Sequence, residues 1–433
     1  MAGIAPGERP DMDDASAGAR AQAIIRDMRL VVFLLSLPFG MLWFMLPVVG
    51  RDMGASALEI GGLYSVFSLM TVLLRPVVGR AIDRFGRRPF FLAGAASYAV
   101  GNLAYAAATN VAGLYAARIA QGVGSGLTWL AAYSMVADLA GSLERGGRFG
   151  QIDEMASRGG IVGLAAAFAL MGYLGESAGW SASFYLFTAV GLLALAIAAR
   201  RVPETAPARR AAPQTAGQPV PWSQRWQKYR SLFHASFATL MGIVLLTASA
   251  YALTSPILIL FLRDHITSSV VHIALAFAPS ALIYAFLPSR LGKISDRFGR
   301  RLPMGIALTV GGLVSLAIPH LRSIWPLIML WIAESVCFAG ATPAEEALVA
   351  DLSAPDARGL AYGIYTGTYS LGSVIGPLLG GWVYERYGEA TPFFIAAGML
   401  WLGAALIFRV LKVPAPAGPA AEPAAAEGNK AEA

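Results

Sequence analysis

Two glutamates inside one long apolar stretch are the residues of this 433-residue chain best placed to do proton chemistry. Glu334 and Glu345 are 11 residues apart (345 − 334), so on a helix they share a face and stand about 16 Å apart along its axis. An ionisable group in hydrocarbon is costly, and a buried carboxyl group can load and release a proton. A structural hydrogen bond to a neighbouring helix is the alternative role for Glu334, and we favour the proton role over it.

A second polar stripe occupies an earlier apolar stretch, where polar side chains recur at steps of three and four residues. That spacing places them on one face of a helix, and we expect this face to line a central cavity. The stripe consists of Arg118, Gln121, Ser125, Trp129 and Tyr133.

The next apolar stretch opens with three charged residues, Asp153, Glu154 and Arg158. Glu154 and Arg158 are four residues apart, so they can form an ion pair on the helix surface. Asp153 points elsewhere and is the weaker candidate for a cavity or proton site.

Two stripes of aromatic and hydroxyl groups complete the predicted substrate and proton pathway. Rings with a polar tip can hold lipophilic or cationic solutes by stacking and cation–π contact. Packing between helices explains the same spacing and is the alternative. The stripes are Thr247, Tyr251 and Thr254, and Tyr362, Tyr365 and Tyr369.

The elements that must position these residues are apolar runs of about 20 residues, each long enough to cross roughly 30 Å of hydrocarbon as a helix. Hydrophobic residues make up 56% of the chain and charged residues 14%, which is more apolar material than a soluble core of this length holds. We therefore predict an all-α polytopic membrane protein with twelve transmembrane helices. The runs lie near residues 29–49, 58–79, 89–109, 112–137, 150–174, 181–199, 232–262, 270–291, 303–321, 324–349, 361–383 and 391–412.

The placement of charge predicts how the chain sits in the lipid bilayer. Of its Lys and Arg residues, 26 fall on the side of the two termini, 4 on the opposite side and 3 within spans. This bias predicts a multi-pass plasma (inner) membrane protein with both termini in the cytoplasm, and it explains the net charge of +7 without a nucleic-acid partner. The single cysteine, Cys337, excludes an intramolecular disulfide and a thiol-based metal cage, and we expect no metal and no cofactor.

A cationic motif that occurs twice divides the chain into related halves. Asp-Arg-Phe-Gly-Arg-Arg at residues 83–88 returns at residues 296–301, an offset of 213 (296 − 83). Arg51-Asp52 is likewise answered by Arg263-Asp264, at an offset of 212 (263 − 51). Six spans per half in the same orientation predict a parallel repeat about an axis along the membrane normal.

The predicted domains follow from this repeat and from local composition. Aromatic and basic residues at helical spacing between the halves predict a short interfacial helix or, alternatively, only an aromatic belt at the start of the seventh span. The domains are a disordered tail over 1–25, a six-helix half over 26–200, a cytoplasmic linker over 201–231, a second six-helix half over 232–412 and a disordered tail over 413–433.

Two motifs make the chain resemble a transporter of the major facilitator superfamily over about residues 25–412. The family signature between spans two and three reads Gly-x-x-x-Asp-Arg-x-Gly-Arg-Arg, and the signature in span four reads Arg-x-x-Gln-Gly. The first is filled by Gly79, Asp83, Arg84, Gly86, Arg87 and Arg88, and the second by Arg118, Gln121 and Gly122.

The resemblance implies that the cationic motifs form a conformational latch, which closes the cytoplasmic side when the substrate site opens outward. An aspartate would accept hydrogen bonds at a helix N-terminus of the opposite half, while arginines pair with acidic helix ends. Positive-inside topology is the alternative, but it does not explain an aspartate inside a basic motif twice. The implied latch residues are those of the first motif with Asp138, and Gly292, Asp296, Arg297, Arg300, Arg301 and Asp351.

The resemblance also implies a function, which is secondary active transport by alternating access. It leans toward proton-coupled efflux of drug-like or other small molecules by a monomer, with no enzyme activity. A permease for a sugar, organic anion or metabolite is the first alternative, and a non-transporting receptor or scaffold on the same fold is the second. The absence of a Gly-x-x-x-x-Gly-Lys-Ser/Thr loop argues against ATP-driven transport.

One glycine pattern departs from the family's antiporters, which carry Gly-x-x-x-Gly-Pro in span five. Here Leu164 stands where that proline would fall, after Gly159 and Gly163. The full pattern lies in span eleven instead, at Gly372, Gly376 and Pro377, and Gly380 continues it. We expect these glycines to let span eleven approach a partner helix closely.

Overall fold

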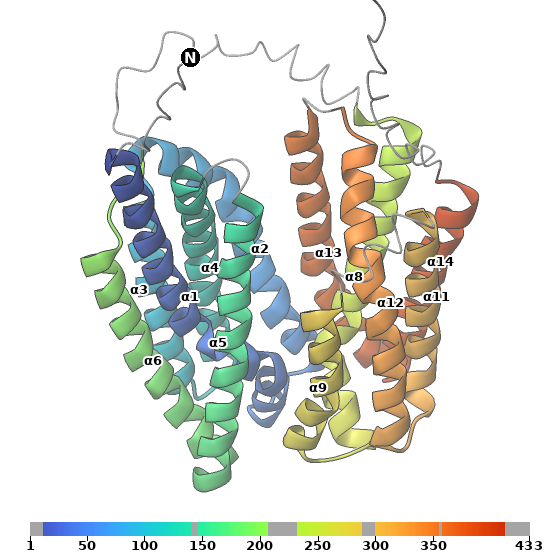
Figure 1. Cartoon of the computed structure of the whole chain (residues 1–433). Helices are drawn as coiled ribbons and strands as arrows, with labels where there is room; N and C mark the ends of the chain where they lie inside the picture. Colours follow the sequence, from blue (N-terminus) through green and yellow to red (C-terminus); the bar gives the residue numbers. More distant parts are fainter. Residues whose placement is uncertain (1–11, 141–144, 207–231, 288–298, 355–356, 412–433) are drawn as a thin grey trace, which may run out of the picture. The chain divides into compact units, whose positions relative to one another are not determined.

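The computed structural model describes residues 12–140, 145–206, 232–287, 299–354 and 357–411, and these form twelve α-helices and one 3-10 turn. The prediction of an all-α architecture with twelve helices is confirmed (Figure 1). Within the described residues, nine of the helices are long and apolar enough to cross a membrane. The other three, α4, α9 and α13, coincide with predicted spans but are either shorter or richer in glycine and hydroxyl-bearing residues.

Two of the first six helices, α2 and α4, begin at a polar residue that caps an apolar run. Ser56 accepts a hydrogen bond from the backbone of Glu59, which in turn accepts from the backbone of Ser56. Asn110 accepts from the Gly113 N–H in the same way at the next helix but one. Such caps satisfy N–H groups that the helix itself leaves unpaired. The first six helices are α1 (Met12–Asp52), α2 (Ala57–Phe85), α3 (Arg88–Ala107), α4 (Val111–Leu139), α5 (Arg145–Leu174) and α6 (Glu176–Arg201).

The second six helices repeat this order. They are α8 (Ala235–His265), α9 (Val270–Phe286), α11 (Arg301–Ala317), which continues into the 3-10 turn η1 (Ile318–His320), α12 (Ile324–Asp351), α13 (Arg358–Tyr387) and α14 (Thr391–Arg409). Three predicted latch residues, Gly292, Asp296 and Arg297, lie outside the described residues. So do the predicted tails beyond residues 12 and 411 and the linker segment that carries the predicted interfacial helix.

Most of the first cationic motif is helical. α2 continues to Phe85, so Asp83 lies in its last turn, and only Gly86 and Arg87 separate α2 from α3. Gly86 has a φ of 94°, and Gly299, at the same place in the second motif, has a φ of 83°. Both angles lie in the region that favours glycine, so the glycine makes the sharp reversal possible.

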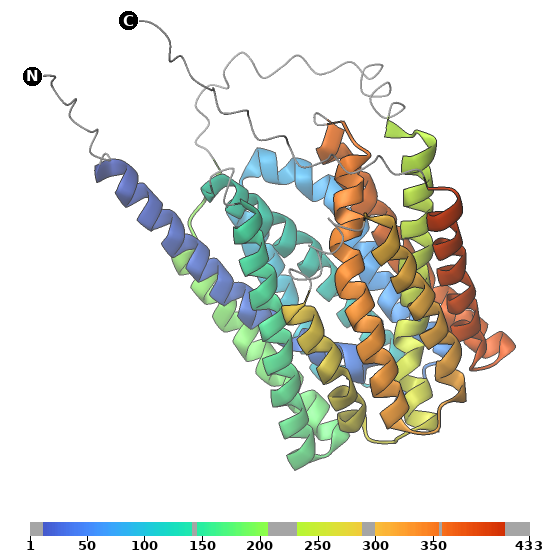
Figure 2. The same cartoon turned by 45° about the vertical axis from the view of Figure 1, so that its right-hand side comes forward.

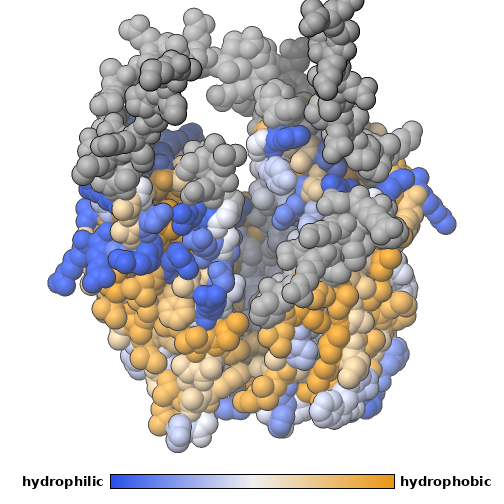
Figure 3. Space-filling view, in the orientation of Figure 1, coloured by the Kyte–Doolittle hydropathy of each residue, from blue (hydrophilic) through white to orange (hydrophobic). Residues whose placement is uncertain are grey.

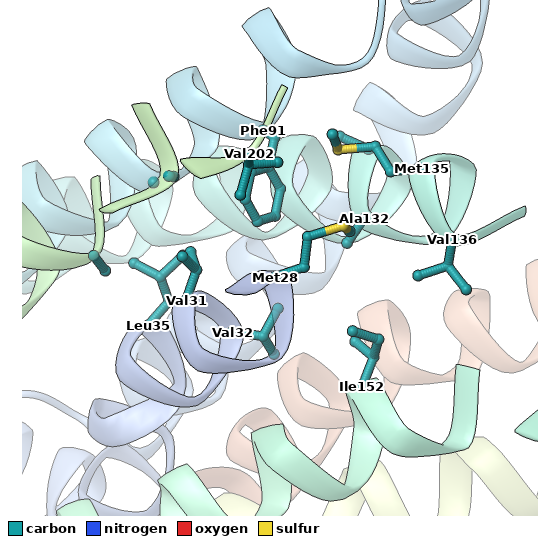
Figure 4. Packing of buried hydrophobic residues seen from close by; sticks show 14 of the residues in the cluster. Met28, Val31, Val32, Leu35, Phe91, Ala132, Met135, Val136, Ile152 and Val202 are labelled. Carbon is teal, nitrogen blue, oxygen red and sulfur yellow. The ribbon is translucent and has the colours of Figure 1, made fainter. Parts of the chain in front are cut away.

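An apolar core holds the first helices together beside this motif. It includes Val78 and Ile82 of α2, which are four residues apart and therefore share a face of the helix. Side chains from all six of the first helices and from the segment after α6 belong to this core, and Figure 4 shows some of them in close contact. They include Met28, Val31, Val32 and Leu35 of α1, Phe91 of α3, Ala132, Met135 and Val136 of α4, Ile152 of α5, and Val202.

The outer face of these helices is apolar, as a surface that meets lipid would be. The long helices α1 and α6 lie side by side (Figure 2). Leu186, Leu192 and Leu193 of α6 are about half exposed. Hydrophobic residues cover much of the face shown in Figure 3, with hydrophilic residues gathered near its upper edge. In water this surface would favour aggregation, whereas hydrocarbon solvates it.

The described residues group into two compact units that do not coincide with the two sequence halves. The first unit combines α1 to α6 with Ala248–Leu275 and Tyr369–Ala396, and the second includes Ala276–Thr368. Parts of α8 and α13 thus join the first unit, because they contact α1 and α2 near Asp52. The boundaries of the two sequence repeats stay a prediction.

Glycines of the two repeats bring equivalent helix pairs into backbone contact. A Cβ atom at Gly163 of α5 would meet the Leu37 carbonyl of α1, and one at Gly376 of α13 would meet the Ser249 carbonyl of α8. The offset is again 213 (376 − 163). The expected close approach of the eleventh span is confirmed, and its partner is the seventh.

Substituting Gly163 tests this packing. The added methyl group of Gly163→Ala would meet the α1 backbone, and overpacking costs about 1–3 kcal/mol, so the variant should melt several degrees below wild type in detergent. Gly172→Ala in the same helix is the matched control, because a Cβ atom there meets no described atom within 4 Å. If Gly163→Ala is as stable as Gly172→Ala, the close approach of α1 and α5 is wrong.

Candidate functional site

Arg118 is buried between α4 and α2 and is held by neutral groups. Its Nη1 donates to Gln121 Oε1 at 2.7 Å and its Nε to the Leu63 carbonyl at 3.1 Å. The ring centres of Tyr64 and Phe67 lie 4.9 and 4.6 Å from the guanidinium carbon. Only 6% of Arg118 is exposed, so dipoles and ring faces stabilise its charge where water has little access.

The predicted polar stripe of α4 divides into two environments. Gln121 is fixed by the Tyr105 hydroxyl of α3 at 3.1 Å, and Ser125 is buried one turn further on. Trp129 and Tyr133 are only partly buried, with ring centres 5.8 Å apart. The Arg118 end of the stripe is therefore buried, and the Tyr133 end is partly exposed.

The Tyr133 end is completed by the start of α5. The Tyr133 hydroxyl donates to Asp153 Oδ1 at 2.5 Å, and the Phe149 ring lies 5.4 Å from the Tyr133 ring. Glu154 and Arg158 form the expected ion pair with each other. The exposed Asp153 takes no part in this pair and instead binds Tyr133. The structure thus brings Trp129, Tyr133 and Asp153 together and adds Phe149, which the sequence reasoning missed.

The carboxyl groups of α12 have different surroundings. The Tyr365 hydroxyl of α13 lies within hydrogen-bonding reach of the partly buried Glu345 carboxyl. Glu334 is partly buried next to Cys337, on the same helix. Two further predicted residues, Tyr251 and Tyr369, are partly exposed on α8 and α13 in the first unit. Among these residues, Glu345 and Tyr365 are a pair in contact.

Equivalent ion pairs form beside the two cationic motifs. Arg87 Nε donates to Asp138 Oδ2 at 2.9 Å, and its Nη2 lies 3.5 Å from Asp83 Oδ1. Arg300 Nε contacts Asp351 Oδ2 at 3.4 Å in the second unit. The pairs are related by the offset of 213 found in the sequence (300 − 87), so each motif is tied to the end of the second helix after it.

Glu204, in the segment after α6, binds the first cationic motif, and the sequence reasoning missed this residue. Its carboxylate accepts hydrogen bonds from the backbone N–H groups of Arg87 and Arg88 at 2.9 and 3.1 Å. Thr205 and Ala206 donate their N–H groups to it as well. A lone acidic residue within a basic segment was the available signal. Glu204 caps α3 and thereby holds the start of the linker on the first motif.

Crossed ion pairs join the C-terminal ends of α1 and α8. Arg51 Nη1 lies 3.1 Å from Asp264 Oδ2, and Arg263 Nη1 lies 3.4 Å from Asp52 Oδ1. Arg263 Nη2 also lies 3.8 Å from Glu176 Oε2 at the start of α6. We call this end of the first unit the Arg51 end. The repeat of Arg51-Asp52 in the sequence was noticed, but its crossed pairing was not predicted.

These motifs and helices agree with a comparison to known families. The family model described as Major Facilitator Superfamily matches residues 29–254 and again residues 240–432. The chain belongs to this family. It is therefore a multi-pass integral membrane protein that transports small molecules by secondary transport, and not an enzyme.

Relatives within the superfamily cover most of the chain at low identity. The chain is 21% identical to "Quinolone resistance protein NorA" of Staphylococcus aureus over 377 residues, which are 87% of this chain and 93% of that protein. It is 22% identical to "Multidrug resistance protein 2" of Bacillus subtilis over 376 residues, or 87% of this chain and 92% of that protein.

Solved structures of superfamily transporters share the fold. The nucleoside transporter NupG, as a point mutant, aligns with a TM-score of 0.72 at 16% identity, over 90% of this chain and 100% of that chain. A bacterial homologue of the human lysosomal transporter Spinster aligns with a TM-score of 0.71 at 16% identity, over 92% of this chain and 99% of that chain. At these identities the likeness shows the fold alone.

Glu204→Gln tests the cap on α3. Burial raises the pKa of the Glu204 carboxyl, but four backbone hydrogen bonds outweigh burial and hold its pKa below the usual value. A lowered pKa means that the carboxylate stabilises the folded state above the unfolded pKa of about 4.3, and that this stabilisation is lost as the pH falls through the folded pKa. We expect Glu204→Gln to melt below wild type at neutral pH, with a difference that shrinks below about pH 4.

Glu154→Gln is the control for this experiment, because Glu154 forms an exposed ion pair within one helix, where such pairs contribute little. A stability loss in Glu204→Gln that is the same at every pH would contradict the role of the charge.

Proposed function

We propose that this chain exports drug-like small molecules across the plasma (inner) membrane in exchange for protons, by alternating access. Membership of the superfamily supports the statement that the chain is a transporter. The direction and the substrate class rest on the two relatives whose names refer to quinolone and multidrug resistance, each covering 87% of this chain.

The observation that carries proton coupling is the environment of Glu345. This carboxyl lies inside α12, and the partner described for it is the hydroxyl of Tyr365 rather than a cation. A hydroxyl can accept a hydrogen bond from the protonated acid or donate one to the carboxylate, so both protonation states keep a partner. An ionisable group in a membrane-crossing helix is expensive, which favours a functional role.

A second acidic site supports binding of the substrate. Asp153 accepts a hydrogen bond from the Tyr133 hydroxyl, and the ring centres of Trp129 and Phe149 lie 5.8 and 5.4 Å from that of Tyr133. Ring faces with one carboxylate suit a lipophilic solute that carries positive charge. Glu334 stays a candidate for the proton pathway, and Tyr251 and Tyr369 stay candidates for substrate contact.

The proposed orientation places the cationic motifs and both termini in the cytoplasm, because Lys and Arg concentrate on that side. The Arg51 end is then external. Asp83 and the arginines of the motif act as a cytoplasmic latch, as the family resemblance implies, and Arg87 is already paired with Asp138. We propose that the chain works as a monomer in the lipid bilayer.

Proteoliposomes test the proposed coupling. Under an imposed pH gradient, wild type should move lipophilic cations with a matching proton flux, and Glu345→Gln should fall to the level of empty liposomes, because a glutamine cannot carry the proton. The control is Glu154→Gln, at an exposed ion pair. Undiminished gradient-driven transport by Glu345→Gln would reject Glu345 as the proton carrier. Glu334→Gln is measured in the same assay, because Glu334 is the other candidate for the proton pathway.

The same assay separates the alternative functions. Transport of sugars, organic anions or nucleosides in place of lipophilic cations would favour a metabolite permease. No flux of any solute and no proton movement would favour a receptor or scaffold on the same fold.

Labelling of single cysteines tests the proposed orientation. In a Cys337→Ser background, which removes the one native cysteine, Arg322→Cys should react with a membrane-impermeant maleimide in intact cells. Arg322 is exposed in the turn before α12. Arg200→Cys, exposed near the last residue of α6, should react only after the cells are opened. The reverse pattern would show that the charge bias has been misread.

A further inference from the structure

Arg75 is a charged residue inside a membrane-crossing helix to which the proposed function gives no role. It lies in α2, 10 residues before the helix ends at Phe85 (85 − 75), and it is exposed. Its Nη1 lies 3.5 Å from the hydroxyl of Ser370, a neutral residue of α13 in the same unit. Among the residues that the structure describes, no carboxylate pairs with Arg75. A charge at this depth without a counter-ion is costly, which favours a functional role.

The packing of α2 on α4 places Arg75 next to the face of α4 that carries Tyr133. A Cβ atom at Gly126 of α4 would lie 3.3 Å from the Cβ atom of Leu74, the neighbour of Arg75. Tyr133 lies seven residues beyond Gly126 (133 − 126), which is about two turns along the same face. Helical side chains lean toward the N-terminus of their helix, so the Tyr133 ring extends back toward Arg75. The guanidinium acts electrostatically on the Tyr133 hydroxyl.

Asp153 supplies the opposite charge at the same tyrosine. Its Oδ1 accepts the hydrogen bond from the Tyr133 hydroxyl, and Asp153 is exposed, as Arg75 is. Arg75 and Asp153 form no ion pair with each other, whereas Glu154 and Arg158 do. A cation and an anion thus lie near one tyrosine, each with a neutral hydroxyl as its described hydrogen-bond partner. Both charges therefore remain available to a solute that carries two charges of its own.

We propose that Arg75 and Asp153 select zwitterionic aromatic solutes, in which Arg75 binds a carboxylate and Asp153 binds an amine. The inference rests on the proposed substrate site around Tyr133 and narrows its substrate class from lipophilic cations to molecules that carry both charges. A guanidinium can hold a carboxylate by two parallel hydrogen bonds. A bound zwitterion compensates both side chains at once, whereas a solute with only a positive charge leaves Arg75 without a counter-ion. The rings of Trp129 and Phe149 would contact the aromatic part.

Three related solutes test this selection. They are a naphthalene with an aminomethyl group at one end and a carboxylate at the other, its methyl ester and its N-acetyl derivative. Equilibrium dialysis against the purified full chain in detergent gives the three affinities. Wild type should bind the zwitterion about tenfold more tightly than either derivative, because each derivative loses one charge-assisted hydrogen bond.

Variants of the two charged residues should each remove one preference. Arg75→Gln should bind the zwitterion no better than the methyl ester, and should bind the ester at least as tightly as wild type does. Asp153→Asn should bind the zwitterion no better than the N-acetyl derivative. Arg80→Gln is the matched control and should keep the wild-type affinities, because Arg80 is exposed on the same helix and its Nε donates to the Pro76 carbonyl one turn away.

Three results would overturn the selection. They are equal affinities of wild type for the zwitterion and the methyl ester, no binding of any of the three solutes, and an equal loss for all three in Arg75→Gln, as expected if Arg75 only holds α2 against α13. Dialysis uses no membrane and no gradient, so charge-selective binding by a chain without proton-linked flux would retain the selection and reject the proposed function. Proton-linked export by a chain that binds the ester as tightly as the zwitterion would do the reverse.

Discussion

Hydrocarbon offers no water to satisfy a backbone group or a charge, and the arrangement of this chain depends on that constraint. Several described charges lie at helix ends, where they pair with one another, as Arg87 does with Asp138 and Arg51 with Asp264. Arg118 and Glu345 are exceptions inside helices, and each is held by neutral groups. At Arg118 and Glu345 the surroundings screen charge weakly. The binding of a proton or a charged solute would therefore change the electrostatic energy most strongly there.

Glycine determines which helices can touch in these surroundings. The contacts of Gly163 with α1 and of Gly376 with α8 are equivalent in the two repeats, so each repeat keeps the same internal pair. The contacts of Gly61 with the Pro377 carbonyl and of Gly381 with the Ala57 carbonyl join α2 and α13, which belong to different repeats. The first kind packs helices within one repeat, whereas the second kind packs helices of both repeats together.

Much of the fold follows from the sequence, because span length and glycine spacing are local patterns. Twelve runs of the right length were enough to predict twelve helices. The family resemblance implied that arginines of the first motif pair with acidic helix ends such as Asp138, and the structure shows that Arg87 makes this pair. The roles of Glu204 and Glu385 were not predictable. Each caps a helix far away in the chain, at Arg88 and at Leu58, and a single sequence does not say which distant N–H group a carboxylate will meet. The site was predicted in pieces, such as Tyr133 and Asp153, whose contact depends on how α4 meets α5.

The crossed ion pairs carry an evolutionary consequence. Arg51 meets Asp264 and Arg263 meets Asp52, so each Arg-Asp dipeptide is bound to its own duplicate. After a gene duplication, the two copies of most positions change independently. Here, the loss of a charge in one copy removes the ion-pair partner of a charge in the other copy. Among diverged descendants of this chain, the two dipeptides should be kept, exchanged in sign or lost together.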